Sequence, residues 1–168
     1  MRRTLATLLI TVPLLAQAPV PAPDPFAALR FLLGTWLGEG AGQPGQASGE
    51  ATFSQALGGH ALIRRSWAET TAASGRPASR HEDRMTIYPE GGQVKALYVD
   101  NEGHVIHYTV TASADGAELR SDPGPGPRFR LIYHRVGPDT VALSFEIAPP
   151  GKPETFTTYL QATTRRKR

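Results

Sequence analysis

Hydrophobic and polar residues alternate along most of this chain, with the period of two that is typical of half-buried β-strands. From Arg80 to Thr86 the even positions are polar, whereas Met85 and Ile87 are apolar. Turn-forming pairs such as Gly-Gly, Asp-Gly and Gly-Pro separate the alternating stretches. The pattern predicts ten short strands, at 35–42, 47–56, 60–70, 80–89, 93–100, 104–112, 116–121, 127–136, 139–148 and 154–164.

The stretch before the first strand has helical spacing instead. Asp24 and Pro25 form a favourable helix start, because Asp is a good N-cap and Pro fits the first helical position. Gly34 is expected to end the helix. The apolar residues in between fall on one helical face, and they are Phe26, Leu29, Leu32 and Leu33.

No helix is expected between the strands, so their short connections predict an antiparallel meander. Closure of such a meander removes its exposed edges. The sequence therefore predicts an all-β fold, an antiparallel up-and-down β-barrel of about ten strands with a short N-terminal helix capping one end. Trp36 is expected to pack that closed end, with a late arginine such as Arg165 over its ring.

The alternation also predicts which side chains face the lumen of the barrel. The odd positions between 80 and 89 contain the apolar residues, so His81, Asp83 and Met85 are expected to point inward. If the connection between 60–70 and 80–89 is centred on Gly75, odd-numbered residues of the two strands lie opposite each other and share a face. On that basis Arg65 and Trp67 point inward, and Arg65 lies beside Asp83.

In the later strands, Lys95 and Arg130 are interpreted as outward-facing residues. The lumen-facing residues are then mostly apolar or aromatic, and they are Val94, Ala96, Tyr98, Ile106, Tyr108, Val110, Phe129, Leu131, Tyr133, Val141, Leu143, Phe145, Phe156 and Leu160. A barrel of about eight strands encloses its own side chains or one small ligand, so ten strands predict a ligand pocket. The predicted ligand-binding residues are Arg65, Trp67, His81, Asp83, Met85, Tyr98, Tyr108, Tyr133 and Phe145.

The beginning of the chain is typical of a secretory signal peptide, with Arg2 and Arg3 before an apolar run and the small-residue pattern Ala16-Gln17-Ala18. The apolar run is about half of the roughly 20 residues that a membrane-spanning helix needs, so no stable membrane span is expected. A secreted or periplasmic location follows. The predicted division is a signal peptide at 1–18, a proline-rich spacer at 19–24, the barrel domain at 25–164 and a basic tail at 165–168.

Composition excludes several classes of function. The chain has no cysteine, which excludes disulfides, thiol catalysis and thiolate metal sites. The formal net charge of +3 includes Arg2, Arg3 and the four basic residues at 165–168. Without these six residues, 12 Lys and Arg stand against 15 Asp and Glu, a net charge of −3. A basic groove for nucleic acid is therefore not indicated.

Two successive arginines, Arg64 and Arg65, carry the sharpest chemical inference. Neighbouring residues of a strand face opposite sides, so one of the two points inward and needs a partner such as Asp83. That arginine is either half of a structural ion pair or the group that binds an anionic ligand.

The spacing of the histidines, carboxylates and serines predicts no catalytic residue and no metal site. His81 and Asp83 share a face and could orient an imidazole, whereas His104 and His107 lie on opposite faces of a regular strand. There is no Gly-x-Ser-x-Gly nucleophile motif. Enzyme activity is left open.

The start of the first predicted strand, 33–40, reads Leu-Gly-Thr-Trp-Leu-Gly-Glu-Gly. Its Gly34-Thr35-Trp36 resembles the Gly-x-Trp signature of lipocalin and calycin barrels, and the longer run resembles the nitrobindin-like branch and bacterial lipocalin-like families of uncharacterised function. Arg65-Ser66-Trp67 and His81-Glu82-Asp83 resemble two later strands of nitrobindins. The resemblance implies a β-barrel with a ligand in its lumen.

Nitrobindins bind haem through a histidine near the C-terminal end of the barrel, but residues 135–168 contain no histidine. That ligand does not carry over to this chain. Haem held by His81, His107 or His134 is an alternative, because a neutral imidazole is a competent axial ligand.

Three functional hypotheses follow. The main one is an exported lipocalin-like protein that binds a small, mainly apolar molecule in the barrel lumen, with an anionic end at Arg65. The first alternative is a haem barrel that reacts with nitrogen or oxygen species. The second is a non-catalytic scaffold whose lumen is filled by its own side chains.

Overall fold

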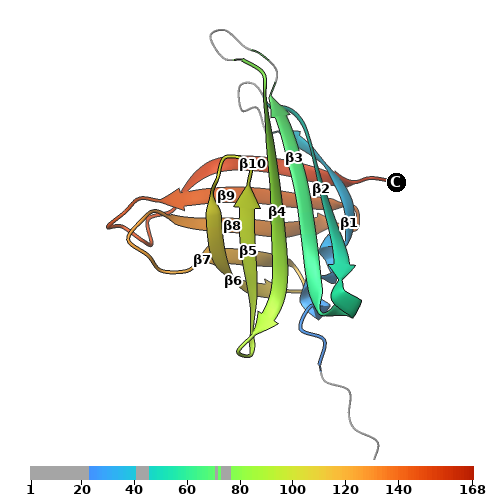
Figure 1. The fold of residues 1–168 in the computed structure, drawn as a ribbon. Helices are drawn as coiled ribbons and strands as arrows, with labels where there is room; N and C mark the ends of the chain where they lie inside the picture. The colour runs from blue at the N-terminus through green and yellow to red at the C-terminus, as the bar shows by residue number, and fades with distance from the viewer. Residues whose placement is uncertain (1–22, 41–45, 71, 73–76) are drawn as a thin grey trace, which may run out of the picture.

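The computed structural model describes residues 23–40, 46–70, 72 and 77–168, and its strands form one closed antiparallel barrel (Figure 1). Each strand pairs with the next one in sequence, and β1 pairs with β10. The all-β barrel and its ten strands are as predicted. The strands are β1 (Gly34–Gly40), β2 (Gln46–Ala56), β3 (Ala61–Thr70), β4 (Ser79–Glu90), β5 (Gln93–Asp100), β6 (Val105–Ser113), β7 (Gly116–Ser121), β8 (Arg128–Gly137), β9 (Thr140–Ala148) and β10 (Thr157–Arg166).

A short helix, η1 (Ala27–Leu32), packs against β6 and β7 and closes one end of the barrel. It is a 3-10 helix of six residues. The helix begins at Ala27 and not at the predicted Pro25, so Phe26 is its N-cap in place of Asp24. Asp24 Oδ1 instead accepts a hydrogen bond from the Phe26 amide at 2.9 Å, in the turn before the helix. Of the predicted apolar face, Phe26, Leu29 and Leu32 are each 1% exposed, whereas Leu33 is only partly buried. A second 3-10 turn, η2 (Leu57–Gly59), joins β2 to β3.

Trp36 anchors the closed end of the barrel. Its side chain is buried, and its indole nitrogen donates to the Leu32 carbonyl at 2.7 Å. The guanidinium of Arg166 lies 4.3 Å from the centre of the Trp36 ring and donates to the carbonyls of Leu33 and Phe31. The expected arginine was Arg165. Arg166 takes this place because the register pairs it with Trp36 and β10 runs two residues beyond its predicted end.

The inner faces of most strands point as predicted. Strands β4, β5, β6, β8 and β9 place their expected residues in the lumen, with Met85, Ala96, Tyr108, Leu131 and Val141 among the buried ones. These residues belong to one hydrophobic core that also includes the apolar face of η1. The half of the lumen next to η1 is therefore filled by side chains.

The predicted parity of β3 is wrong. Arg64 pairs in register with Met85 and is buried, whereas Arg65 pairs with Arg84 and is exposed. Trp67 likewise pairs with the outward-facing Glu82. Opposite residues of a strand pair share one face, so even positions of β3 face odd positions of β4.

The error came from the connection between β3 and β4. The prediction centred this connection on Gly75, which lies outside the described residues. The observed register pairs Thr70 with Ser79, which puts residues of opposite parity face to face. A change of one residue in the register turns every side chain of a strand to the other face.

Phe156 is also misplaced by the prediction, because it precedes β10 and lies on the outside of the barrel. Its ring lies 4.3 Å from the guanidinium of Arg130 and 5.3 Å from that of Arg120. A register shift between Thr158 and Leu160 then brings Leu160 opposite Phe145. Leu160 is therefore on the inner face, as expected.

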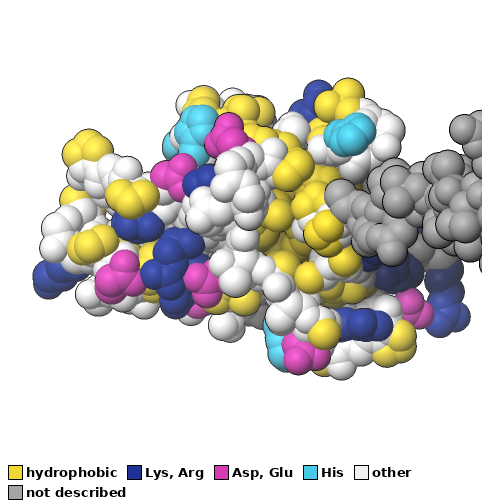
Figure 2. Space-filling model, turned by 90° about the horizontal axis from the view of Figure 1, so that it is seen from below, with side chains coloured by type: hydrophobic (Ala, Val, Ile, Leu, Met, Phe, Trp, Pro, Cys, Tyr) yellow, Lys and Arg dark blue, Asp and Glu magenta, His cyan; other side chains and the backbone are white. Residues whose placement is uncertain are grey.

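Seen from below, hydrophobic side chains gather in the middle of the face, beside the start of the described chain (Figure 2). Charged side chains lie mainly toward the margins of this view. Residues 1–22, which include the predicted signal peptide, lie outside the described residues. Among the described helices, none has the length and apolar character needed to cross a bilayer.

Candidate functional site

The end of the barrel opposite η1, here called the mouth, carries the turn 101–104 and the loops before β8 and β10. Inward-facing apolar side chains near the mouth are only partly buried, whereas most of those near η1 are buried. Phe129 and Phe145 stack there with ring centres 6.0 Å apart. The residues of this half-exposed apolar lining are Tyr98, Ile106, Phe129, Phe145 and Leu160. The lumen is thus packed at one end and accessible at the other.

A buried ion pair marks the boundary between these two halves. Arg64 Nη1 donates to Asp83 Oδ1 at 2.7 Å, and the two side chains are 9% and 5% exposed. Ser66 also hydrogen-bonds to the Asp83 carboxylate. Burial raises the pKa of Asp83, and the charge of Arg64 opposes that effect. The pair is a charged group held inside an otherwise apolar lumen.

Two polar atoms beside this pair have no hydrogen-bond partner among the described residues: Arg64 Nε and the Tyr133 hydroxyl. Arg64 is 7% exposed and Tyr133 is 6% exposed, so bulk water does not reach either group freely. Burying a polar atom without a partner costs about 1–3 kcal/mol. Both groups can therefore donate a hydrogen bond to an acceptor that enters the lumen.

Three tyrosines surround the ion pair as neutral hydrogen-bonding groups. Burial raises the pKa values of the Tyr98, Tyr108 and Tyr133 hydroxyls above their ordinary range. Each hydroxyl therefore keeps its proton at neutral pH, and those of Tyr108 and Tyr133 can donate to a bound molecule. Tyr133 is fixed by an edge-on contact with the ring of Phe53, with centres 5.6 Å apart.

A chain of hydrogen bonds runs from His81, which lies beside the ion pair, along the mouth. His81 Nε2 lies 3.1 Å from the Tyr98 hydroxyl, which donates to Asp100 Oδ2 at 3.1 Å. Asp100 Oδ2 also lies 2.8 Å from His104 Nδ1. Although burial acts in the opposite direction, hydrogen bonds from His104 and its neighbours lower the pKa of Asp100. The mouth therefore has a polar side, formed by β4, β5 and the following turn.

The structure brings five of the predicted ligand-binding residues to Arg64 or its ion pair: Met85, His81, Asp83, Tyr108 and Tyr133. Tyr98 joins them through His81, and Phe145 lies in the apolar lining of the mouth. Arg65 and Trp67 are on the outer face of the barrel. Whether any of these residues binds a ligand stays a prediction.

The prediction missed Arg64 as the inward-facing arginine. The adjacent pair Arg64 and Arg65 showed that one of them must be buried, but not which one. It also missed Asp100 at the mouth. Asp100 ends β5 and precedes a turn, so its sequence context resembles that of an ordinary turn residue.

Only one of the three histidines considered for haem is on the inner face. His81 points into the mouth, whereas His107 and His134 are exposed on the outer side of β6 and β8. The two outer histidines cannot reach a group bound in the lumen.

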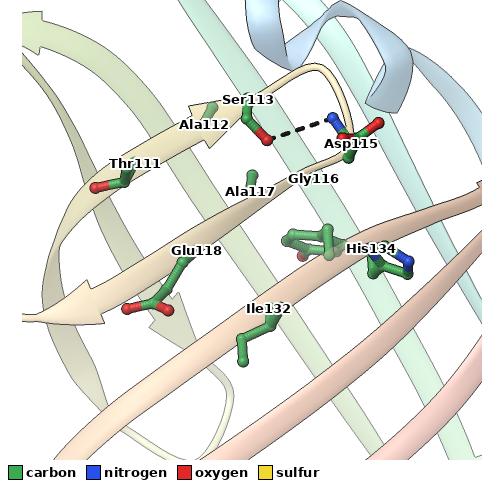
Figure 3. Close-up of a pocket in the computed structure, with 10 residues that line it drawn as sticks. Thr111, Ala112, Ser113, Asp115, Gly116, Ala117, Glu118, Ile132 and His134 are labelled. Carbon is green, nitrogen blue, oxygen red and sulfur yellow. Dashed lines mark hydrogen bonds between the residues drawn. The ribbon is translucent and has the colours of Figure 1, made fainter.

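The outer wall carries two hollows. The larger one, of about 610 Å³, includes the misplaced residues Arg65 and Trp67, and the guanidinium of Arg80 lies 4.7 Å from the centre of the Trp67 ring. The other, of about 280 Å³, lies over β6, β7 and β8. Figure 3 shows Glu118, Ile132 and His134 around it, with the Ser113 hydroxyl accepting from the Asp115 amide at 3.3 Å. Both hollows are open to the surface, and the linings also include residues of the inner face, Asp83 in the larger hollow and Tyr133 in the other.

No protein-family model matches the chain, and no curated protein matches it. Among solved structures, it is similar to the crystal structure of Rv2717c from M. tuberculosis, with a TM-score of 0.59, 20% identity and coverage of 88% of this chain and 99% of that chain. The chain has a lipocalin-like fold. The S-type phycobiliprotein lyase CPES from Guillardia theta is a more distant likeness, with a TM-score of 0.47, 9% identity and coverage of 83% and 90%.

Proposed function

We propose that this protein binds a small, mainly apolar molecule in the mouth half of its lumen, with an anionic or hydrogen-bond-accepting end at Arg64 and Tyr133. The main support is the pair of buried donors, Arg64 Nε and the Tyr133 hydroxyl, that have no hydrogen-bond partner within the described part of the chain. The half-exposed aromatic lining above them suits an apolar tail. Arg64 replaces Arg65 as the proposed anion-binding group.

A fluorescent fatty acid, cis-parinaric acid, is a suitable probe because it has an apolar tail and one carboxylate. We expect Arg64→Gln to weaken its binding at least about tenfold, which corresponds to about 1.4 kcal/mol. Arg65→Gln is the matched control, since it removes the same charge from the adjacent position on the outer face. Equal affinities in both variants would remove Arg64 from the site.

Because Arg64→Gln also leaves Asp83 without its partner, the variant has a folding cost of its own. Tyr133→Phe avoids that problem, since the hydroxyl has no hydrogen-bond partner among the residues that the structure describes. It should leave the free energy of unfolding unchanged, or raise it by up to about 1–3 kcal/mol, while probe binding weakens. A lumen that takes up neither the acid nor the corresponding alcohol would favour the scaffold hypothesis.

The export of the protein and its family branch belong to the same proposal. We infer a secreted or periplasmic location from the N-terminal pattern at 1–18, and the nitrobindin-like branch from the motifs at 33–40, 65–67 and 81–83. Intact mass spectrometry of protein recovered from the periplasm and the medium tests the location. Protein that keeps residues 1–18 and stays in the cytoplasm would contradict it.

A further inference from the structure

Four potential metal ligands converge at the polar side of the mouth. His81 comes from β4 and Asp100 from the end of β5, while Glu102 and His104 come from the turn that follows. One ligand atom from each of His81, Asp100 and Glu102 lies within 4.8 Å of the others. His104 Nδ1 lies 2.8 Å from Asp100 Oδ2 and 3.9 Å from Glu102 Oε2.

The Asp100 carboxylate is held so that one oxygen faces this cluster. Its Oδ1 accepts hydrogen bonds from the backbone amides of Glu102 at 3.0 Å and His104 at 2.9 Å. Its side chain is 3% exposed, in a position fixed by the turn. Oδ2 is therefore the oxygen that is directed toward the other ligands.

The His81 ring is oriented in the way that metal-binding histidines usually are. Its Nδ1 faces Glu102 Oε1 at 3.3 Å, inside the cluster. Its Nε2 faces the protein, 3.1 Å from the Tyr98 hydroxyl and 3.7 Å from Asp83 Oδ2. A carboxylate or hydroxyl behind the second ring nitrogen fixes the tautomer and raises the basicity of the ligating nitrogen. The Tyr98 hydroxyl thus supports the ring from inside the lumen.

The spacing and the chemistry of the donors fit a four-coordinate ion. Metal–ligand bonds of about 2.0–2.2 Å in a tetrahedron place neighbouring donors roughly 3.3–3.6 Å apart. His81 Nδ1 lies 3.3 Å from Glu102 Oε1, within that range, whereas His104 Nδ1 lies 3.9 Å from Glu102 Oε2 and 2.8 Å from Asp100 Oδ2. The side chains of Glu102 and His104 are each 60% exposed, so they have room to adjust around an ion. Two imidazoles with two carboxylates suit a divalent transition ion, whereas magnesium and calcium prefer oxygen ligands alone.

We propose that His81, Asp100, Glu102 and His104 bind one divalent transition-metal ion, of which Zn²⁺ is the natural probe, at the mouth of the barrel. The site lies on a different set of side chains from the Arg64 and Tyr133 donors, so it stands independently of the proposed ligand. An ion here would tie the turn after β5 to β4 and place a positive charge beside the entrance to the lumen.

Isothermal titration of chelator-treated protein with Zn²⁺ tests the site. We expect one ion per chain with micromolar or tighter affinity, weakened at least tenfold in His81→Ala and in His104→Ala. His107→Ala is the matched control, because His107 lies on β6 but faces outward, and it should bind Zn²⁺ unchanged. No binding up to millimolar Zn²⁺, or binding that ignores His81, would overturn the proposal.

The exposed ligands keep the test independent of folding. Glu102 and His104 side chains are each 60% exposed, so Glu102→Gln and His104→Ala should fold normally. Co²⁺ provides a second readout, since tetrahedral Co²⁺ absorbs strongly in the visible range and six-coordinate Co²⁺ only weakly. The strong band should appear in the parent protein and in His107→Ala, and be lost in Glu102→Gln. A weak octahedral spectrum in the parent protein would contradict the four-ligand site.

Discussion

Gly34 stands where the chain leaves η1 and enters β1, and two features of that point exclude a side chain. Its φ of +115° is one that residues with a Cβ rarely adopt. A Cβ at this position would also come within 2.6 Å of Arg166 Nη1. Arg166 needs that space to reach the Leu33 carbonyl and to cover Trp36. The glycine of the Gly34-Thr35-Trp36 motif is therefore required by the contact that seals the closed end.

We expect Gly34→Ala to lower the free energy of unfolding by about 2–4 kcal/mol, because backbone strain of about 1–3 kcal/mol adds to the displacement of Arg166. Urea unfolding followed by tryptophan fluorescence measures the loss. Gly91→Ala is the control, since Gly91 has a φ of +57° but nothing within 4 Å of an added Cβ. An equal loss of unfolding free energy in the two variants would show that the displacement of Arg166 does not contribute to the effect of Gly34→Ala.

At the scale of single strands, the inward-facing side of β3 could not be predicted from the sequence. Lys95 and Arg130 identified the outer faces of β5 and β8, because an unpaired charge avoids the lumen. In β3 both Arg64 and Arg65 are charged, so the same rule gives no answer. The choice depends on the β3–β4 register, which depends in turn on the length of a connection that the alternation does not reveal.

The two tryptophans of the chain allow a test of which side chains of β3 face the lumen. Trp36 is 2% exposed, whereas Trp67 lies half-buried on the outer face, beneath Arg80. Acrylamide should quench the fluorescence of Trp67→Phe, which retains Trp36, much less than that of Trp36→Phe, which retains Trp67. Equal protection of both tryptophans would place Trp67 in the lumen and contradict the observed register.

At the scale of the whole molecule, the barrel is closed by the pairing of its first and last strands. Leu37 lies opposite Arg165 in this seam, and both neighbours of β1 in the barrel, β2 and β10, run antiparallel to it. The chain has no cysteine of its own, so an introduced pair would have no competing partner. The seam can therefore be probed with a single disulfide.

The double variant Leu37→Cys with Arg165→Cys should form a disulfide on oxidation. The bond would close a loop of well over about 100 residues, and a bond of that kind typically contributes about 2–4 kcal/mol. Urea midpoints of the oxidised and reduced forms measure the gain, with Leu37→Cys alone as the control. Thiols that remain free in the folded protein would contradict closure at this seam.

The fold was predicted from the sequence pattern, but the grouping of polar residues at the mouth was not. Ten strands, one capping helix and the aromatic inner face followed from alternation and turn chemistry. The polar cluster at the mouth did not follow from that pattern. His81 lies near Asp100 and the turn after it only because β4 pairs with β5. Spacing along one strand cannot reveal a site whose members come from two strands and a turn.

The contact between Trp36 and Arg166 also has a consequence for the order of events when the protein is made. Synthesis proceeds from the N-terminus, so Trp36 emerges well before the residue that covers it. A chain extended only as far as β9 leaves β1 with an open edge and its indole without the arginine. Ribosome-bound chains that end before β10 should therefore remain sensitive to protease, and resistance should appear only after β10 is free to dock.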